Sequence, residues 1–167
     1  CFLSLEPGHP HVFSASYGEN RLDRVTVPGG PHGERLLTFD SGRNSHCAAL
    51  SPDGRFLYAT SLGDDRVSWF STDFPVAHGG NASDDGVIAP AGQVAADAGS
   101  GPRYLRLNSR GDRAYVVHEL SGHVAVYARD PETGGLEFVQ RISAVEGLGL
   151  KPGVVRGGGT PDPGPDV

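Results

Sequence analysis

The chain has 167 residues and a formal net charge of −6, and its 14 lysines and arginines are scattered along the sequence. A nucleic-acid partner is therefore not expected, because such partners need clustered positive charge. No apolar run approaches the ~20 residues of a membrane-spanning helix, so no membrane partner is expected either. The abundant glycines and prolines, 25 and 13 residues, favour short elements joined by tight turns.

A 13-residue pattern occurs three times, each copy an aromatic residue that begins a strand, then a turn, then a second strand. The copies are Phe13–Val25, Tyr58–Phe70 and Tyr115–Tyr127; they align without a gap, and their starts lie 45 and 57 residues apart. This spacing is near the ~40–50-residue period of β-propeller blades. One such hairpin cannot bury its own faces, so the copies are expected to stack on one another.

The second and third copies extend into complete four-stranded units. Around the second copy, turn residues separate four expected strands at 47–50, 55–62, 66–71 and 87–96. Around the third, the expected strands are 104–107, 113–120, 124–128 and 136–143. Four antiparallel strands in chain order make one propeller blade.

The predicted fold is all-β, a partial β-propeller of about three blades of four-stranded antiparallel sheet over residues 1–145. The blades are expected at roughly 10–45, 46–97 and 98–145, and the Gly/Pro-rich residues 146–167 are expected to form a disordered tail. Because roughly four to eight blades close a propeller, and because the chain starts with Cys1, we expect a piece of a longer protein that is inactive by itself.

Strand pairing predicts which polar residues meet, because opposed residues of an antiparallel hairpin have numbers with a constant sum. A turn centred on Gly54 pairs His46 with Leu62, and a turn centred on Gly111 pairs Arg103 with Glu119. His46, Arg103 and Glu119 would then converge on one face near the central channel, as a possible acid/base site. The alternatives are a cross-strand ion pair between Arg103 and Glu119 and a histidine that merely ends a strand.

The remaining candidate groups predict neither a disulfide framework nor a metal site. Cys47 lies in an apolar strand and is expected to pack as a small hydrophobe, and with only Cys1 besides it the chain fits a reducing, cytoplasmic compartment. His9 and His11 could face one way on a strand, but no third ligand follows at a recognisable spacing.

Two long segments resemble a known family. NSHCAALSPDGRFLYATSLGDDRVSWF (44–70) and GPRYLRLNSRGDRAYVVHELSGHVAVY (101–127) are similar to successive units of the lactonase family of seven-bladed propellers. That family includes bacterial 6-phosphogluconolactonase and the fungal carboxy-cis,cis-muconate cyclase, and the resemblance covers about residues 10–145. It implies a seven-bladed parent and an enzyme without metal or organic cofactor.

Carried over by position, the resemblance makes His46 the catalytic histidine, Arg103 the substrate-binding arginine and Glu119 the catalytic acidic residue. Tyr104 stands where the family has histidine and His118 where it has asparagine, and both are expected to bind substrate. A further arginine expected in the next blade has no counterpart near 151–156.

The implied function is hydrolysis of a sugar-acid lactone, most closely that of a 6-phosphogluconolactonase in carbohydrate metabolism. The expected partner is a small anionic lactone or carboxylate. Two alternatives stay open: a muconate cyclase that closes a lactone with the same residues, and a propeller that binds a partner through one face without catalysis.

Overall fold

The computed structural model describes residues 2–5, 11–26, 35–73 and 87–155, which form three four-stranded antiparallel sheets and, in these ranges, no helix. We call the sheets the first, second and third blade. The first contains β1 (Phe2–Leu5), β2 (His11–Ser16), β3 (Arg21–Thr26) and β4 (Arg35–Asp40). The second contains β5 (Ser45–Leu50), β6 (Phe56–Ser61), β7 (Arg66–Asp73) and β8 (Val87–Ala95). The third contains β9 (Pro102–Leu107), β10 (Arg113–His118), β11 (His123–Arg129) and β12 (Leu136–Ser143).

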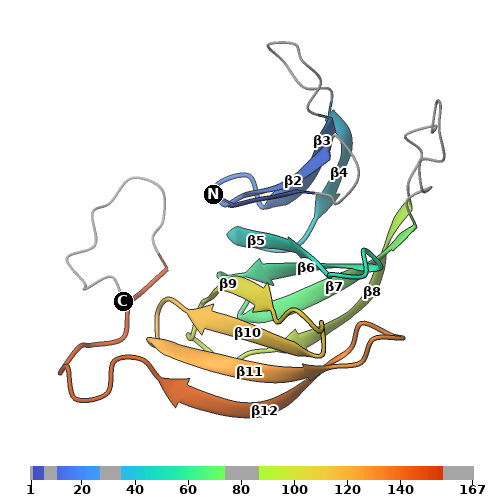
Figure 1. The fold of residues 1–167 in the computed structure, drawn as a ribbon. Coiled ribbons are helices and arrows are strands. Elements are labelled where there is room, and N and C mark those ends of the chain that lie inside the picture. The colour runs from blue at the N-terminus through green and yellow to red at the C-terminus, as the bar shows by residue number, and fades with distance from the viewer. Residues whose placement is uncertain (1, 6–10, 27–34, 74–86, 156–167) are drawn as a thin grey trace.

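Strands that are neighbours in the chain are neighbours in each sheet, and Figure 1 shows the three blades arranged side by side, with the second between the others. The all-β prediction is confirmed. The first blade includes β1, which precedes the expected start near residue 10, and it ends with β4 at Asp40.

The threefold sequence repeat is also a repeat of the backbone. The eighth residue of each copy has a positive φ: 57° at Asn20, 48° at Asp65 and 64° at Gly122. This left-handed conformation is accessible to Asn, Asp and Gly, and it closes the turn before β3, β7 and β11. Each copy also has a register shift near its end, at Arg24/Val25, Trp69/Phe70 and Val126/Tyr127.

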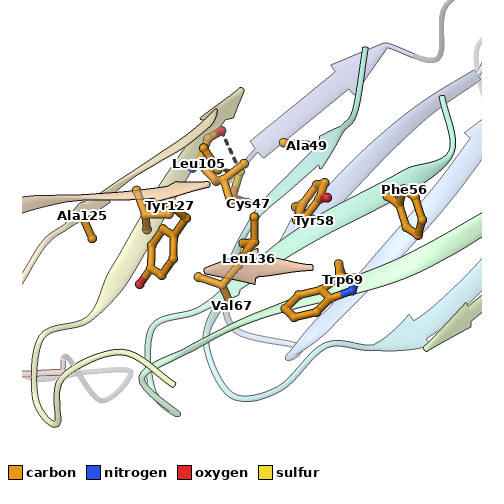
Figure 2. Packing of buried hydrophobic residues seen from close by; sticks show 12 residues of the cluster. Cys47, Ala49, Phe56, Tyr58, Val67, Trp69, Leu105, Ala125, Tyr127 and Leu136 are labelled. Atoms are coloured by element: carbon orange, nitrogen blue, oxygen red, sulfur yellow. Dashed lines mark hydrogen bonds between the residues drawn. The ribbon is translucent and has the colours of Figure 1, made fainter. Parts of the chain in front are cut away.

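The main core lies between the second and third blades (Figure 2). Tyr58, Val67 and Trp69 of the second blade pack with residues of the third, among them Leu105 and Leu136. The Cys47 thiol donates to the Leu105 carbonyl at 3.7 Å, drawn as the dashed line in Figure 2, so this hydrogen bond joins β5 to β9. Burial raises the pKa of the Cys47 thiol to about 12, and its place in the core fits the expected packing role.

A smaller core joins the first and second blades, where Phe13 and Leu22 pack with Leu57 and Phe70. Since both faces of the second blade are covered, every residue of β6 is buried. The outer blades differ: Leu3 on β1 and Phe138 and Ile142 on β12 are more than half exposed, at 70%, 55% and 55%. No helix in the described ranges is long and apolar enough to cross a membrane.

Candidate functional site

The first strands of the second and third blades each carry one extra residue. Ser45 pairs with Ser61 and Cys47 with Thr60, so His46 has no partner in β6. Pro102 pairs with His118 and Tyr104 with Val117, so Arg103 has no partner in β10. The predicted pairs His46–Leu62 and Arg103–Glu119 are therefore wrong. The regular part of each ladder is already one residue off the predicted turn centre, since Ala48 pairs with Ala59 and Leu105 with Val116. A β-bulge then shifts the register by one more residue at the end of each strand.

The bulges nevertheless bring the predicted residues together. The Arg103 Nε–H donates a hydrogen bond to Nε2 of His46 at 3.2 Å, and Arg103 Nε lies 3.3 Å from Glu119 Oε2 as an ion pair. The Glu119 backbone N–H donates to the Gly101 carbonyl at 2.8 Å, which holds this residue beside the bulge. An imidazole from the second blade thus meets a guanidinium and a carboxylate from the third. A bulge commonly re-aims a side chain in this way.

Aromatic rings fix His46 from two sides. Its ring lies edge-on to Tyr104, with centroids 5.0 Å apart and an interplanar angle of 84°, and edge-on to Tyr17 at 5.8 Å and 74°. The guanidinium carbon of Arg103 lies 5.0 Å from the centroid of the Tyr104 ring, within range of a cation–π contact. Tyr104 therefore lies at the predicted site, where it contacts both His46 and Arg103.

The surroundings of the buried His46 favour its neutral form. Burial, together with the nearby Arg103 charge, lowers the pKa of His46 below its ordinary value. His46 is 7% exposed, and its Nδ1 is buried with no hydrogen-bond partner in the described part of the chain. Arg103 and Glu119 are more accessible, with side-chain exposures of 35% and 19%, so a ligand from solvent can reach them.

A cavity of about 190 Å³ lies beside this cluster. Its walls come from all three blades and from the segment after β12: Tyr17, His46, Leu62, Glu119, Leu120, Val154 and Val155. Tyr17, Leu62 and Glu119 occupy the fifth position of their respective repeat copies. Aligning the copies therefore groups Tyr17 and Leu62 with Glu119, although neither side chain is predicted from its residue type to act at the site.

Part of the segment expected to be a disordered tail lies against the third blade. The Gly153 N–H donates to the Leu120 carbonyl at 2.7 Å, and Val154 and Val155 line the cavity. The expected tail residues 156–167 lie outside the described residues.

His118, expected to bind substrate, does not lie with His46. Successive residues of a strand point to opposite faces, so His118 points away from the side on which Glu119 lies. Its Nδ1 is 2.9 Å from Ser100 Oγ, and its ring stacks on His123 with centroids 4.2 Å apart. Both histidines line a second cavity of about 180 Å³, together with Tyr127 and Arg141. Burial, with His123 beside it, lowers the pKa of His118 to about 4.

Of the two histidines considered as metal ligands, the structure describes only His11. His11 is buried with Nδ1 2.6 Å from Nη2 of Arg24, while His9 lies outside the described residues. In the ranges that the structure describes, no group of three or more His, Cys, Asp or Glu side chains is arranged to hold a metal ion.

Comparison with known proteins decides the family. The sequence profile described as "Lactonase, 7-bladed beta-propeller" matches residues 1–153. The chain belongs to the lactonase family of seven-bladed β-propellers. It is 31% identical over 133 residues to the 6-phosphogluconolactonase of Cronobacter sakazakii, covering 78% of this chain and 37% of that protein. The chain thus spans less than half the length of this curated relative.

Solved structures of lactonases share the fold. A Bacteroides uniformis protein assigned as a 6-phosphogluconolactonase superposes with a TM-score of 0.70 at 25% identity, over 91% of this chain and 44% of that one. The periplasmic gluconolactonase PpgL of Pseudomonas aeruginosa gives a TM-score of 0.70 at 21% identity, over 85% and 39%. These matches confirm the predicted propeller fold and the predicted family, and the coverage agrees with three blades of seven.

Proposed function

We propose that the protein hydrolyses a sugar-acid lactone, with 6-phosphogluconolactone as the closest candidate substrate. The observation that carries the proposal is the convergence of His46, Arg103 and Glu119 from two blades beside a cavity open to solvent. The resemblance to 6-phosphogluconolactonases supports the choice of reaction. The compartment we propose is the cytoplasm, since the chain carries only two cysteines and Cys47 is a buried free thiol.

Arg103 binds the anionic end of the substrate in this proposal. In the described part of the chain, hydrogen bonding occupies its Nε, and its two terminal amino groups have no hydrogen-bond partner. A guanidinium binds phosphate and carboxylate groups through paired N–H donors, so these amino groups suit an anion. In a chain with a net charge of −6, Arg103 concentrates positive charge at the site.

Ring opening then needs a base and a proton donor. Water attacks the lactone carbonyl carbon, a base takes the water proton, and the ring C–O bond breaks. The leaving ring oxygen takes a proton and becomes the hydroxyl of the acid product. Glu119 and His46, which both line the cavity, are the candidate acid–base groups for this proton. The positive charge of Arg103 stabilises the negative charge that develops on oxygen. The proposed steps require neither a metal nor an organic cofactor.

A substrate comparison tests the proposal. The complete protein should hydrolyse 6-phosphogluconolactone with a lower KM than unphosphorylated gluconolactone, because only the former offers Arg103 a phosphate. Arg103→Ala should remove most of that difference, whereas Arg110→Ala should not, since Arg110 is 77% exposed in a turn and pairs with Asp112. Conversion of carboxymuconate without turnover of either lactone would favour the cyclase instead. Turnover of none of the three would favour a non-catalytic propeller.

A further inference from the structure

The hydrogen bond between Arg103 and His46 defines the protonation of the imidazole. The arginine Nε has one hydrogen, and it points to Nε2 of His46 at 3.2 Å. Nε2 must therefore present its lone pair, and a neutral imidazole that accepts at Nε2 carries its proton on Nδ1. That Nδ1 is buried and has no partner among the described residues. His46 thus has no lone pair free to take a proton from water.

The surroundings oppose a charged imidazole. Burial lowers the pKa of His46, and the Arg103 charge acts in the same direction. Among the residues that the structure describes, the ionisable groups that face it are Arg103 and Tyr104 of β9, Glu119 after β10, and Tyr17 between β2 and β3. Glu119 is the one carboxylate in this set, and its charge is directed to Arg103.

Glu119 has the features that His46 lacks. It lines the cavity, and its ion pair with Arg103 is made through Oε2. Its Oε1 makes no hydrogen bond to any residue in the described ranges. A carboxylate oxygen is an acceptor only, so this atom is available to a water molecule in the cavity.

We propose that Glu119 is the general base and that His46 is a positioning residue, which orients Arg103 by accepting its Nε–H. The role of Glu119 as a base depends on the proposed lactonase reaction. The hydrogen bond by which His46 orients Arg103 does not depend on it. Glu119 takes the proton of the attacking water and returns it to the ring oxygen that leaves, so the carboxylate is regenerated. His46 keeps its proton on Nδ1 throughout, and the two flanking tyrosine rings hold its plane. Arg103 then presents its terminal amino groups to the substrate anion.

Conservative replacements of His46 separate the two roles. His46→Gln retains a side-chain oxygen that accepts from Arg103, whereas His46→Leu retains only volume. We expect His46→Gln to keep kcat within ~10-fold of the parent, with a rise in KM as its main effect and with the acid limb of the pH–rate profile unchanged. His46→Leu should lose ~10²-fold in kcat/KM and Glu119→Gln at least as much in kcat. If His46→Gln is as inactive as His46→Leu, or if its acid limb disappears, His46 is the base and the proposal is wrong.

A spectroscopic measurement tests the geometric part without turnover. In protein labelled with ¹⁵N-histidine, the His46 signals are assigned by their loss in His46→Gln. We expect the Nδ1–H tautomer, an Nε2 shifted by hydrogen bonding, and a pKa below the ordinary histidine value. Arg103→Ala should abolish the Nε2 shift, and Arg110→Ala should not. An Nε2–H tautomer, or a pKa at or above the ordinary histidine value, would overturn the proposal even if the protein proves to be an active lactonase. Conversely, the expected tautomer in a protein that hydrolyses no lactone would support the positioning role and reject the lactonase assignment.

Discussion

Acidification should destabilise the protein through His118. This side chain is 1% exposed and its pKa is lowered from 6.5 to about 4, chiefly by burial and also by the stacked His123. In the unfolded chain the same group takes up a proton near pH 6.5, so between these two values the unfolded state binds more protons. The stabilisation that neutral His118 gives the folded state is therefore fully present above pH 6.5, and it is lost as the pH falls towards 4. A shift of this size corresponds to about 3 kcal/mol, lost at up to ~1.4 kcal/mol per pH unit.

The assay is urea unfolding of the complete protein at several pH values from 7.5 to 4.5, compared with that of His118→Asn. The amide can still hydrogen-bond to Ser100 Oγ but does not titrate, so the variant should lose less stability over this range. Aspartates with lowered pKa values, such as Asp53, lose their contribution at lower pH and affect both proteins equally. A loss of about 3 kcal/mol is large beside the total of roughly 5–15 kcal/mol typical of a domain. Equal pH dependence in the two proteins would refute the reasoning.

Three further predictions concern the packing of the blades. Cys47 should resist thiol reagents in the native protein and react only on unfolding, because its thiol is buried with a pKa of about 12; rapid native-state labelling would contradict this. Arg129→Met should lower stability by about 1–3 kcal/mol in chemical denaturation, because the variant loses the ion pair with Asp53 and the hydrogen bond that the buried Arg129 donates to the Tyr58 hydroxyl; a change below ~0.5 kcal/mol would show that these contacts between the blades are dispensable. The 167-residue chain expressed alone should be inactive and should aggregate or unfold at low denaturant, because apolar residues such as Leu3 and Phe138 are exposed on its outer blades. A monodisperse monomer that melts sharply above ~60 °C would contradict that expectation.

The blades could be predicted because their signals are local and repeated. Each copy has an aromatic start, apolar alternation and a residue tolerant of positive φ at position eight, as at Asn20 and Asp65. Turn residues mark the strand ends so clearly that β12 begins and ends where expected, at Leu136 and Ser143. The stacking of these units was then the only part of the fold that depended on tertiary packing.

The site could be predicted only in part, because its geometry depends on two bulges. A constant-sum rule needs the exact centre of the turn and an uninterrupted ladder. The turn centres lie slightly away from Gly54 and Gly111, and nothing in the residues around His46 or Arg103 indicates the extra residue in each strand. The two residues still meet Glu119. A bulge at the end of a strand moves a side chain by one position, and the side chain remains at that end of the sheet. The same one-residue sensitivity explains His118, whose neighbour Glu119 lies at the site while His118 itself is buried in another cavity.

The central claim is that Arg103, Glu119 and His46 form one lactone-hydrolysing site, and single alanine replacements in the complete protein test it most directly. Turnover of 6-phosphogluconolactone should fall by ~10²-fold or more in each variant, while Arg110→Ala stays at the parent level. Circular dichroism of the same preparations controls for folding. Near-parental turnover in all three folded site variants would contradict the account, because hydrolysis would then take place elsewhere in the molecule.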